Sequence, residues 1–453
     1  MIMTDTQYPS ISRNRLMIFA IIIIILIAGI GIYNIQQKKD SDHDEEQPNG
    51  EEEPLAVEFG DPYPFNSMGY EPSIAADSSG NLFITAHKNV DREYENRFQT
   101  WGNQLASWFF VSNDNGNTWQ VPSGRWKYYL GDEGDIGVDA QDWVYYIDTY
   151  LRDINIHVFS NGGDNLEYST HYKTSVGLDD RPWITAQGDG ILHYLGNNAV
   201  SVGGGRYWYY RSTNAGITWS QGDVVPGDGW LHIDDERNGP HVYIVKETST
   251  AADQDIVMHI SDDYGATWNW DSTVYIDHRN GPNGPPGESR WPVVAAGDNG
   301  TVFVLWGDYE LAEENGSRLF LARSNDYGQT WNTTEITPFP GVLDYPWVAV
   351  GPEGSVGVAF YATKDLPVDD NSEWYIYGGM QFHADVDDIK INFSKADTTP
   401  VYMGNDYHAL HDFFEICITP DHALNIAYQY YVGPGNGDSM LYYVRGELPE
   451  IDK

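Results

Sequence analysis

Four pairs of side chains that could bind a ligand precede the same short motif, a proline followed eight residues later by a glycine. Arginine binds carboxylates through paired N–H groups, acidic side chains accept hydrogen bonds from hydroxyls, and aromatic rings line ligand pockets. If the motifs occupy equivalent places in a repeating fold, these side chains converge on one site. The pairs are Tyr70-Glu71, Asp180-Arg181, Arg290-Trp291 and Asp344-Tyr345. We therefore expect Glu71, Arg181, Arg290, Trp291 and Asp344 to contact a ligand.

Acidic and aromatic residues also gather in segments that follow predicted strands. They include Asp148 in DTYLRD, and the longer stretches 87–101, 308–314 and 365–374. Such a mixture is typical of a sugar-binding or Ca²⁺-assisted site, and equally of solvated loops. Bound Ca²⁺ is compatible with these segments, but no cofactor is required and no histidine spacing predicts a metal site.

The motif that follows these pairs opens a short apolar strand, turns at glycine, and returns along a second strand. The copies run from Pro72 to Gly80, Pro182 to Gly190, Pro292 to Gly300 and Pro346 to Gly354, and weaker versions occur near residues 135–147, 230–245 and 413–428. Seven units spaced by about 50 to 65 residues fit four-stranded blades around a central channel. The sequence predicts an all-β propeller, with seven blades favoured over six.

A second repeat, S-x-D/N-x-G-x-T-W, has the composition of a tight turn. Asp or Asn bonds its own backbone, glycine supplies positive φ, and the closing tryptophan is expected to pack into the core. The copies span Ser112–Trp119, Ser212–Trp219, Ser261–Trp268 and Ser324–Trp331, and their fixed acids or amides are Asp114, Asn214, Asp263 and Asp326. This repeat resembles the Asp box, or BNR repeat, of the sialidase-like β-propellers.

The resemblance implies a box on the turn between outer strands, away from the ligand. It also implies glycoside cleavage by a tyrosine nucleophile and an aspartate acid/base, with arginines that hold a carboxylate. In this chain Tyr345 and Asp91 occupy the corresponding neighbourhoods. However, Tyr70 stands where the family's first arginine belongs, and no third arginine can be assigned. The sequence therefore argues against ordinary sialidase activity.

The N-terminal region differs from the propeller in composition. Leu16 to Tyr33 is an unbroken apolar and glycine run, near the lower length limit of a membrane-spanning helix. The predicted division is a tail at 1–15, an anchor at 16–35, an acidic linker at 36–54 and the propeller at 55–453. A cleaved signal peptide is the alternative. The expected location is the cell membrane, as a single-pass protein with the propeller outside.

Charge and cysteine content limit the partners. The net charge is −42, from 67 acidic and 25 basic residues, so contact with nucleic acid is excluded on electrostatic grounds. The single Cys417 cannot form a disulfide within the chain and is expected to be a small buried hydrophobic side chain.

Three functions stay open from the sequence. The favoured one is a tethered propeller that recognises a glycan or a surface protein at the channel mouth without chemistry. The second is a divergent exo-glycosidase of the sialidase-like group that uses acids such as Asp91, Asp148, Glu71 and Asp344. The third is a structural component of the cell envelope.

Overall fold

The structure, a computed structural model, describes most of the unit Pro54–Lys453. The described residues are 54–87, 107–122, 133–150, 153–174, 179–202, 205–227, 229–248, 255–277, 291–308, 316–433 and 439–449. The predicted anchor and nearly all of the acidic linker lie outside them, so these remain predictions. Among the described residues, no helix has the length and apolar character needed to cross a membrane.

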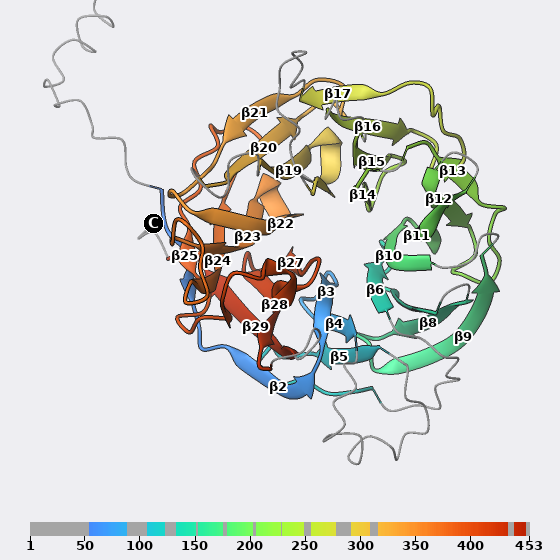
Figure 1. The fold of residues 1–453 in the computed structure, drawn as a ribbon. Helices are drawn as coiled ribbons and strands as arrows, with labels where there is room; N and C mark the ends of the chain where they lie inside the picture. Colours follow the sequence, from blue (N-terminus) through green and yellow to red (C-terminus); the bar gives the residue numbers. More distant parts are fainter. Residues whose placement is uncertain are drawn as a thin grey trace, which may run out of the picture. The chain divides into compact units, whose positions relative to one another are not determined.

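Seven antiparallel sheets stand around a central channel (Figure 1). The innermost strands are β3 (Tyr70–Ala76), β6 (Glu133–Val138), β10 (Asp179–Gln187), β14 (Leu231–Asp235), β18 (Val293–Ala296), β22 (Val342–Val350) and β27 (Glu415–Ile418). The second strands are β4 (Leu82–His87), β7 (Val144–Tyr150), β11 (Ile191–Val202), β15 (Val242–Glu247), β19 (Val302–Asp308), β23 (Val356–Thr363) and β28 (Leu424–Tyr431). The prediction of an all-β propeller is confirmed, and the count is seven rather than six.

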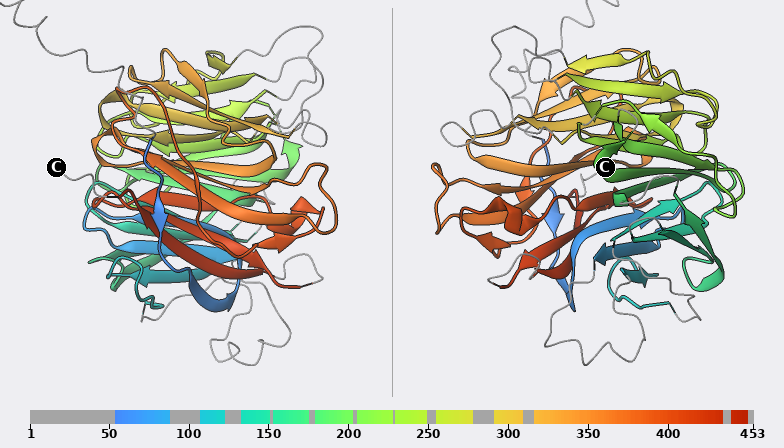
Figure 2. Two further views of the ribbon diagram at one scale, coloured as in Figure 1. Left: turned by 90° about the vertical axis from the view of Figure 1, so that its left-hand side faces the viewer. Right: turned by 45° about the vertical axis from the view of Figure 1, so that its right-hand side comes forward.

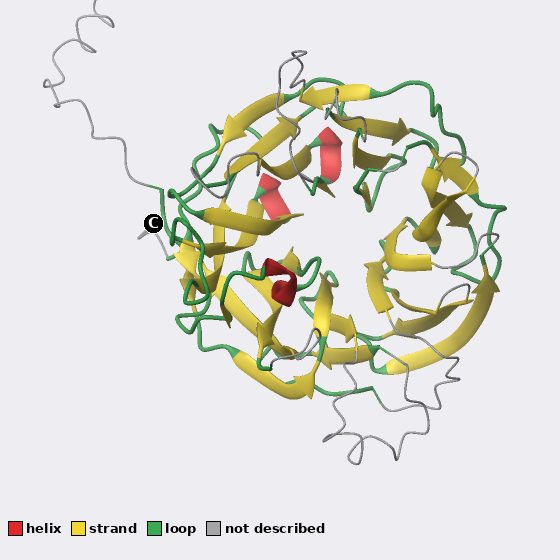
Figure 3. Ribbon diagram, viewed as in Figure 1, coloured by secondary structure: helices red, strands yellow, loops and turns green. Residues whose placement is uncertain are grey.

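The third strands lie further out, followed by short outer strands. The third strands are β5 (Trp108–Ser112), β8 (Asp153–Ser160), β12 (Gly205–Ser212), β16 (Ile256–Ser261), β20 (Arg318–Ser324), β24 (Glu373–Gln381) and β29 (Ser439–Glu447). The outer strands are β9 (Asn165–Lys173), β13 (Asp223–Val225), β17 (Val274–Asp277), β21 (Asn332–Glu335), β25 (Ser394–Lys395) and β26 (Tyr402–Met403). In the described residues the helices are the 3-10 turns η2 (Asp298–Gly300), η3 (Pro352–Gly354) and η4 (Tyr407–Leu410), near the channel (Figure 3).

The ring is closed by the start of the described chain. Strands β1 (Glu58–Phe59) and β2 (Tyr63–Met68) both pair antiparallel with β29. In the side views the blue start of the described chain lies beside the red C-terminal strands (Figure 2). Val57, next to β1, is only 2% exposed and belongs to the core. Residues 58–59 and the strand after them therefore complete the seventh blade. The seventh blade takes its outer strands from the start of the described chain, so within the described residues no turn leads from its third strand to an outer strand.

The Asp boxes follow the third strands of four blades and hold their own turns. In each box the central acid or amide accepts the backbone N–H of the threonine four residues later, at 2.8 to 2.9 Å. The serine hydroxyl accepts the N–H of the box glycine. The tryptophans, Trp119, Trp219, Trp268 and Trp331, are half-buried and pack on the core rather than lying within it. The predicted architectural role of the boxes is confirmed.

The box glycines also pack against the preceding blade. Each has a φ between +68° and +81° and lies against the third strand of that blade. Gly265 shows the contact most clearly, because the Tyr209 hydroxyl of β12 donates to its carbonyl at 3.0 Å. A β-carbon at Gly265 would collide with this hydroxyl and with the His193 ring.

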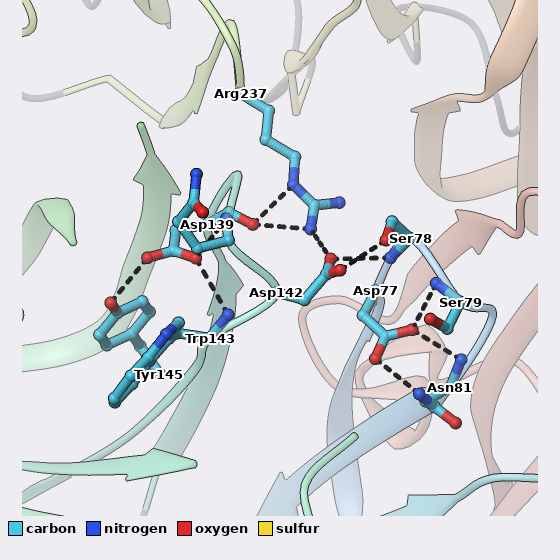
Figure 4. A network of polar contacts seen from close by, with 10 residues as sticks. Asp77, Ser78, Ser79, Asn81, Asp139, Asp142, Trp143, Tyr145 and Arg237 are labelled. Carbon is cyan, nitrogen blue, oxygen red and sulfur yellow. Dashed lines mark hydrogen bonds and ion pairs between the residues drawn. The ribbon is translucent and has the colours of Figure 1, made fainter. Parts of the chain in front are cut away.

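The end of the channel where the innermost strands turn back is held by polar contacts between blades (Figure 4). Arg237, after β14, donates to the Asp139 carbonyl at 2.7 and 2.9 Å and to the Asp142 carboxylate at 2.7 Å. Asp142 also accepts the backbone N–H and the hydroxyl of Ser78. These bonds connect the first, second and fourth blades. The opposite end, where the innermost strands begin, is called the channel mouth below.

We predict that Gly265→Ala destabilises the protein by about 1–3 kcal/mol more than Gly188→Ala. Gly188 is a matched control, because its φ is also positive (+59°) but its nearest neighbour, the Ile191 side chain, would lie 3.7 Å from a β-carbon. Both changes carry the backbone penalty of about 1–2 kcal/mol, and only the first adds overpacking. Urea unfolding of both variants would measure the difference. Equal losses would show that the box does not pack tightly on the preceding blade.

Candidate functional site at the channel mouth

One residue of each innermost strand occupies an equivalent position, four residues before the residue at which the strand begins its turn. We call this set the inner ring: Ser73, Asp135, Trp183, His232, Val293, Trp347 and Glu415. Its members differ in character, because aromatic side chains come from blades three, four and six and acids come from blades two and seven.

The aromatic members of the inner ring are in mutual contact. Trp183 lies 5.3 Å from the His232 ring and 5.6 Å from Trp347, and the latter two are 5.0 Å apart, measured between centroids. Phe413 packs on Trp183 at 4.9 Å. Burial lowers the pKa of His232 to about 3, so this imidazole is neutral at physiological pH. Aromatic side chains of blades three, four, six and seven therefore pack against one another.

The acidic members share one hydroxyl. Ser73 Oγ lies 2.6 Å from Asp135 Oδ1 and 2.6 Å from Glu415 Oε2. A serine hydroxyl has one hydrogen, so it can donate a hydrogen bond to only one of the two acids. It must accept a hydrogen bond from the other acid, which is therefore protonated. Asp135 also accepts the backbone N–H groups of Ile136 and Ile184, which favours its ionised form. We infer that Glu415 is the protonated partner and donates to Ser73.

The pKa directions agree with this sharing of one proton. Burial, and then the nearby charge of Asp135, raises the pKa of Glu415 well above its usual value. Burial raises the pKa of Asp135 to about 6, against its hydrogen bonds to Ser73 and to the backbone. Two neighbouring buried acids cannot both ionise without a large cost.

The backbone is strained in three blades at the position two residues before the inner-ring residue, which is closer to the mouth. Glu71, Trp291 and Tyr345 have φ of 49°, 48° and 48°, and each precedes a proline. The pairing of β3 with β4 and of β22 with β23 shifts register at this point, as in a β-bulge. A bulge turns a side chain away from its regular alternation, and such features are frequent beside functional sites.

On the side of blades one and two, the mouth contains a cluster of two glutamates and a histidine. His87 Nε2 lies 3.1 Å from Glu71 Oε2 and 3.6 Å from Glu133 Oε1. One ligand atom from each of the three residues falls within 4.8 Å of the others. Glu71 and Glu133 are 8% and 5% exposed, so their carboxylates have little access to bulk water. We call these three residues the Glu-His-Glu cluster.

Neighbouring groups hold the cluster in place. The Tyr70 ring stacks on the His87 ring, with centroids 4.4 Å apart, and on the His411 ring, with centroids 4.1 Å apart. The backbone N–H of Asp412 donates to Glu71 Oε1 at 3.2 Å, while the other oxygen faces His87. Burial lowers the pKa of His411 to about 4, although Glu71 acts in the opposite direction. His411 is therefore a neutral packing partner at pH 7.

The mouth residues of blades four to six form a second, aromatic wall. Trp230 and Trp291 meet edge to face at 4.1 Å, and Trp291 meets Tyr345 at 5.4 Å. Trp230 and Tyr345 are buried, whereas Trp291 is half-buried. The blades that carry this wall and those that carry the Glu-His-Glu cluster stand on opposite sides of the ring (Figure 1).

The structure unites some of the predicted site residues. Glu71 joins the cluster, and Trp291 contacts Tyr345. Asp344 is buried, and its carboxylate accepts the N–H of Tyr345 at 2.9 Å. Asp148 is buried further from the channel axis, where it accepts the Ser107 hydroxyl at 2.6 Å. Asp91 and Arg290 lie outside the described residues, and of Arg181 only the backbone is described.

Three residues of the mouth lie outside the positions that the sequence indicates, namely Glu133, Trp230 and His411, and His87 is indicated only as the first residue of the stretch 87–101. Glu133 is equivalent to Glu71, but the second blade has Gly134 in place of the marker proline, so the motif did not reveal it. His87 ends a predicted strand and was counted with the loop after it. Alignment on the turn, rather than on the proline, would have found Glu133.

No protein-family model matches this chain, and no curated protein does. Among solved structures, a fungal alcohol oxidase of the AA5 family, solved with copper, is 12% identical, with a TM-score of 0.54 over 87% of this chain and 76% of its own. The NanB sialidase from Streptococcus pneumoniae is 13% identical, with a TM-score of 0.42 over 86% and 70%. An α-L-arabinofuranosidase from Fusarium graminearum is 12% identical, with a TM-score of 0.44 over 86% and 98%. Identities this low show likeness of fold alone. The predicted Asp-box propeller is confirmed by its boxes and its seven blades.

We predict that Glu415→Gln flattens the dependence of stability on pH. A carboxyl whose folded pKa is raised stabilises the protein below its unfolded pKa, near 4.5, and this contribution is lost as pH rises through the folded value. The glutamine keeps a donor for Ser73 and has no proton to lose. The melting temperature of the variant, relative to that of the wild type, should therefore rise between pH 5 and pH 9. A constant difference would contradict the assigned proton.

Proposed function

We propose that this protein binds a carbohydrate at the channel mouth and does not act as an ordinary sialidase. The observation that carries the proposal is the pairing of two walls. Trp291 and its aromatic neighbours offer apolar faces on one side, and the carboxylates of the Glu-His-Glu cluster offer hydrogen-bond acceptors on the other. A sugar ring presents C–H groups and hydroxyls, which fit apolar and acceptor surfaces respectively.

The charge of the site favours a neutral sugar over an acidic one. Buried carboxylates at the mouth and a net charge of −42 would repel a sialic acid. The Asp-box resemblance supports a carbohydrate rather than a nucleic acid, and a glycan on a surface protein would present the same chemistry. We further propose that residues 16–35 anchor the propeller to the outside of the cell membrane as a single-pass protein.

A second candidate function is glycoside hydrolysis, with Glu71 and Glu133 as the carboxyl pair. Retaining glycosidases place two carboxyl groups about 5–5.5 Å apart, and inverting enzymes about 6.5–9.5 Å apart. The ligand atoms of Glu71 and Glu133 lie within 4.8 Å, which is nearer to the retaining arrangement. In this mechanism one glutamate would attack the sugar, and the other would protonate the leaving group.

We predict that Trp291→Ala weakens carbohydrate binding by about ten-fold or more, because buried aromatic contacts typically contribute over about 1 kcal/mol. Binding of neutral and sialylated oligosaccharides to the full chain would be measured by calorimetry. Tyr327→Ala is the matched control, because Tyr327 is an exposed aromatic residue in a box at the other end of the channel. Equal affinity in both variants, or no bound sugar across the panel, would refute the proposal.

The hydrolase candidate makes a separate prediction. The wild type should release product from at least one neutral chromogenic glycoside, and Glu133→Gln should slow release by about 100-fold or more, because proton transfer contributes about 10²–10⁴-fold. Glu236→Gln is the control, since Glu236 pairs with His241 at the other end of the channel. Absence of release from every neutral and sialylated substrate would exclude hydrolysis of these sugars and leave the binding function.

A further inference from the structure

We propose that Glu71, His87 and Glu133 bind a divalent transition-metal ion, Zn²⁺ or Mn²⁺. One imidazole nitrogen and two carboxylate oxygens form a donor set that suits these ions. The inference concerns the same three residues as the proposed function, and a bound ion would take carboxylate oxygens that the hydrolase candidate uses. Its test measures metal binding with no sugar present, so it can fail or succeed separately from the sugar-binding test.

The distances within the cluster fit a coordination shell. Atoms that bind one ion at about 2.0–2.2 Å lie about 3 to 4 Å from one another in tetrahedral or octahedral geometry. His87 Nε2 lies 3.1 and 3.6 Å from its two carboxylate neighbours, and the whole set falls within 4.8 Å. Small side-chain movements would therefore bring all three atoms to one ion.

The three residues come from rigid parts of the fold. Glu71 and Glu133 lie on the innermost strands of adjacent blades, and His87 ends the second strand of the first blade. The strained backbone at Glu71, with φ of 49°, belongs to the bulge that directs this residue, and the Asp412 N–H fixes one of its oxygens. Tyr70 stacks on the His87 ring. Such supporting contacts orient the ligands of protein metal sites.

Charge also favours a cation at this position. Glu71 and Glu133 are each less than 10% exposed, and a divalent ion bound between their carboxylates would interact favourably with both in a site with little access to water. The nitrogen donor argues against Ca²⁺, which prefers six to eight oxygen ligands. Three protein ligands are also the usual number in zinc sites that keep a position open.

The test is metal binding by the purified full chain. The protein is stripped with a chelator, dialysed, and titrated separately with Zn²⁺, Mn²⁺ and Ca²⁺ in a calorimeter, and retained metal is counted by mass spectrometry. We expect one Zn²⁺ or Mn²⁺ per chain, a higher melting temperature with the ion, and much weaker Ca²⁺ binding.

Two isosteric variants, one alanine variant and one control test whether the ion binds to these three residues. Glu71→Gln and Glu133→Gln should each weaken binding by about 100-fold or more, since even supporting residues contribute about 10–100-fold. His241→Ala should bind normally, because His241 pairs with a single carboxylate, Glu236, at 2.6 Å. His87→Ala should abolish binding, and circular dichroism would confirm that each variant is folded. Absence of a stoichiometric ion in the wild type, or unchanged affinity in both glutamine variants, would overturn the proposal.

Discussion

The convergence of seven sheets on one axis is the constraint on which the rest of this structure depends. Each sheet buries its faces against its neighbours, so the innermost strands must begin and end at common depths. A position on one innermost strand is therefore repeated around the channel, and seven side chains share a small space. The strands β1 and β2 maintain this geometry by completing the last blade with the start of the described chain. Without that closure, the edge of β29 would be exposed, and the side chains around the channel would lose their common frame.

Within that frame, the chain separates apolar from acidic side chains. Trp183, His232 and Trp347 pack together on one part of the inner ring, while Asp135 and Glu415 share the Ser73 hydroxyl on another. Burial makes each group depend on its partners: the histidine stays neutral, and the two acids retain a proton between them. The Glu-His-Glu cluster lies closer to the mouth, and there the glutamates face a histidine rather than a serine. This nitrogen and the two carboxylates are the donor set on which the metal proposal rests.

The sequence predicted the fold better than the site, and the reason is physical. An Asp box closes its turn with its own side chains, so Asp114 or Asp263 can be recognised from eight consecutive residues. The channel mouth is assembled from residues far apart in the chain, and each blade contributes one or two. Glu71 and Trp291 were found because a proline marks their position. Glu133 was missed because Gly134 stands in place of that proline, and His87 because nothing in its local sequence shows that β4 ends beside Glu71. A turn held by hydrogen bonds within eight residues can be recognised from the sequence. A site whose residues come from several blades cannot be recognised in this way.

The strained residues of the mouth connect the fold to its proposed chemistry. A left-handed backbone costs a non-glycine residue about 1–2 kcal/mol, yet Glu71, Trp291 and Tyr345 adopt it at equivalent positions. Requirements of the propeller alone do not explain their types, since any residue would bear the same strain and glycine would bear none. What these three share is a large side chain at the mouth, glutamate in the first blade and aromatic residues in the fifth and sixth, and a register shift accompanies the strain at Glu71 and Tyr345. The strained positions thus place an acid on one side of the mouth and aromatic rings on the other. The sugar proposal uses both sides, whereas the metal proposal uses only Glu71 with His87 and Glu133.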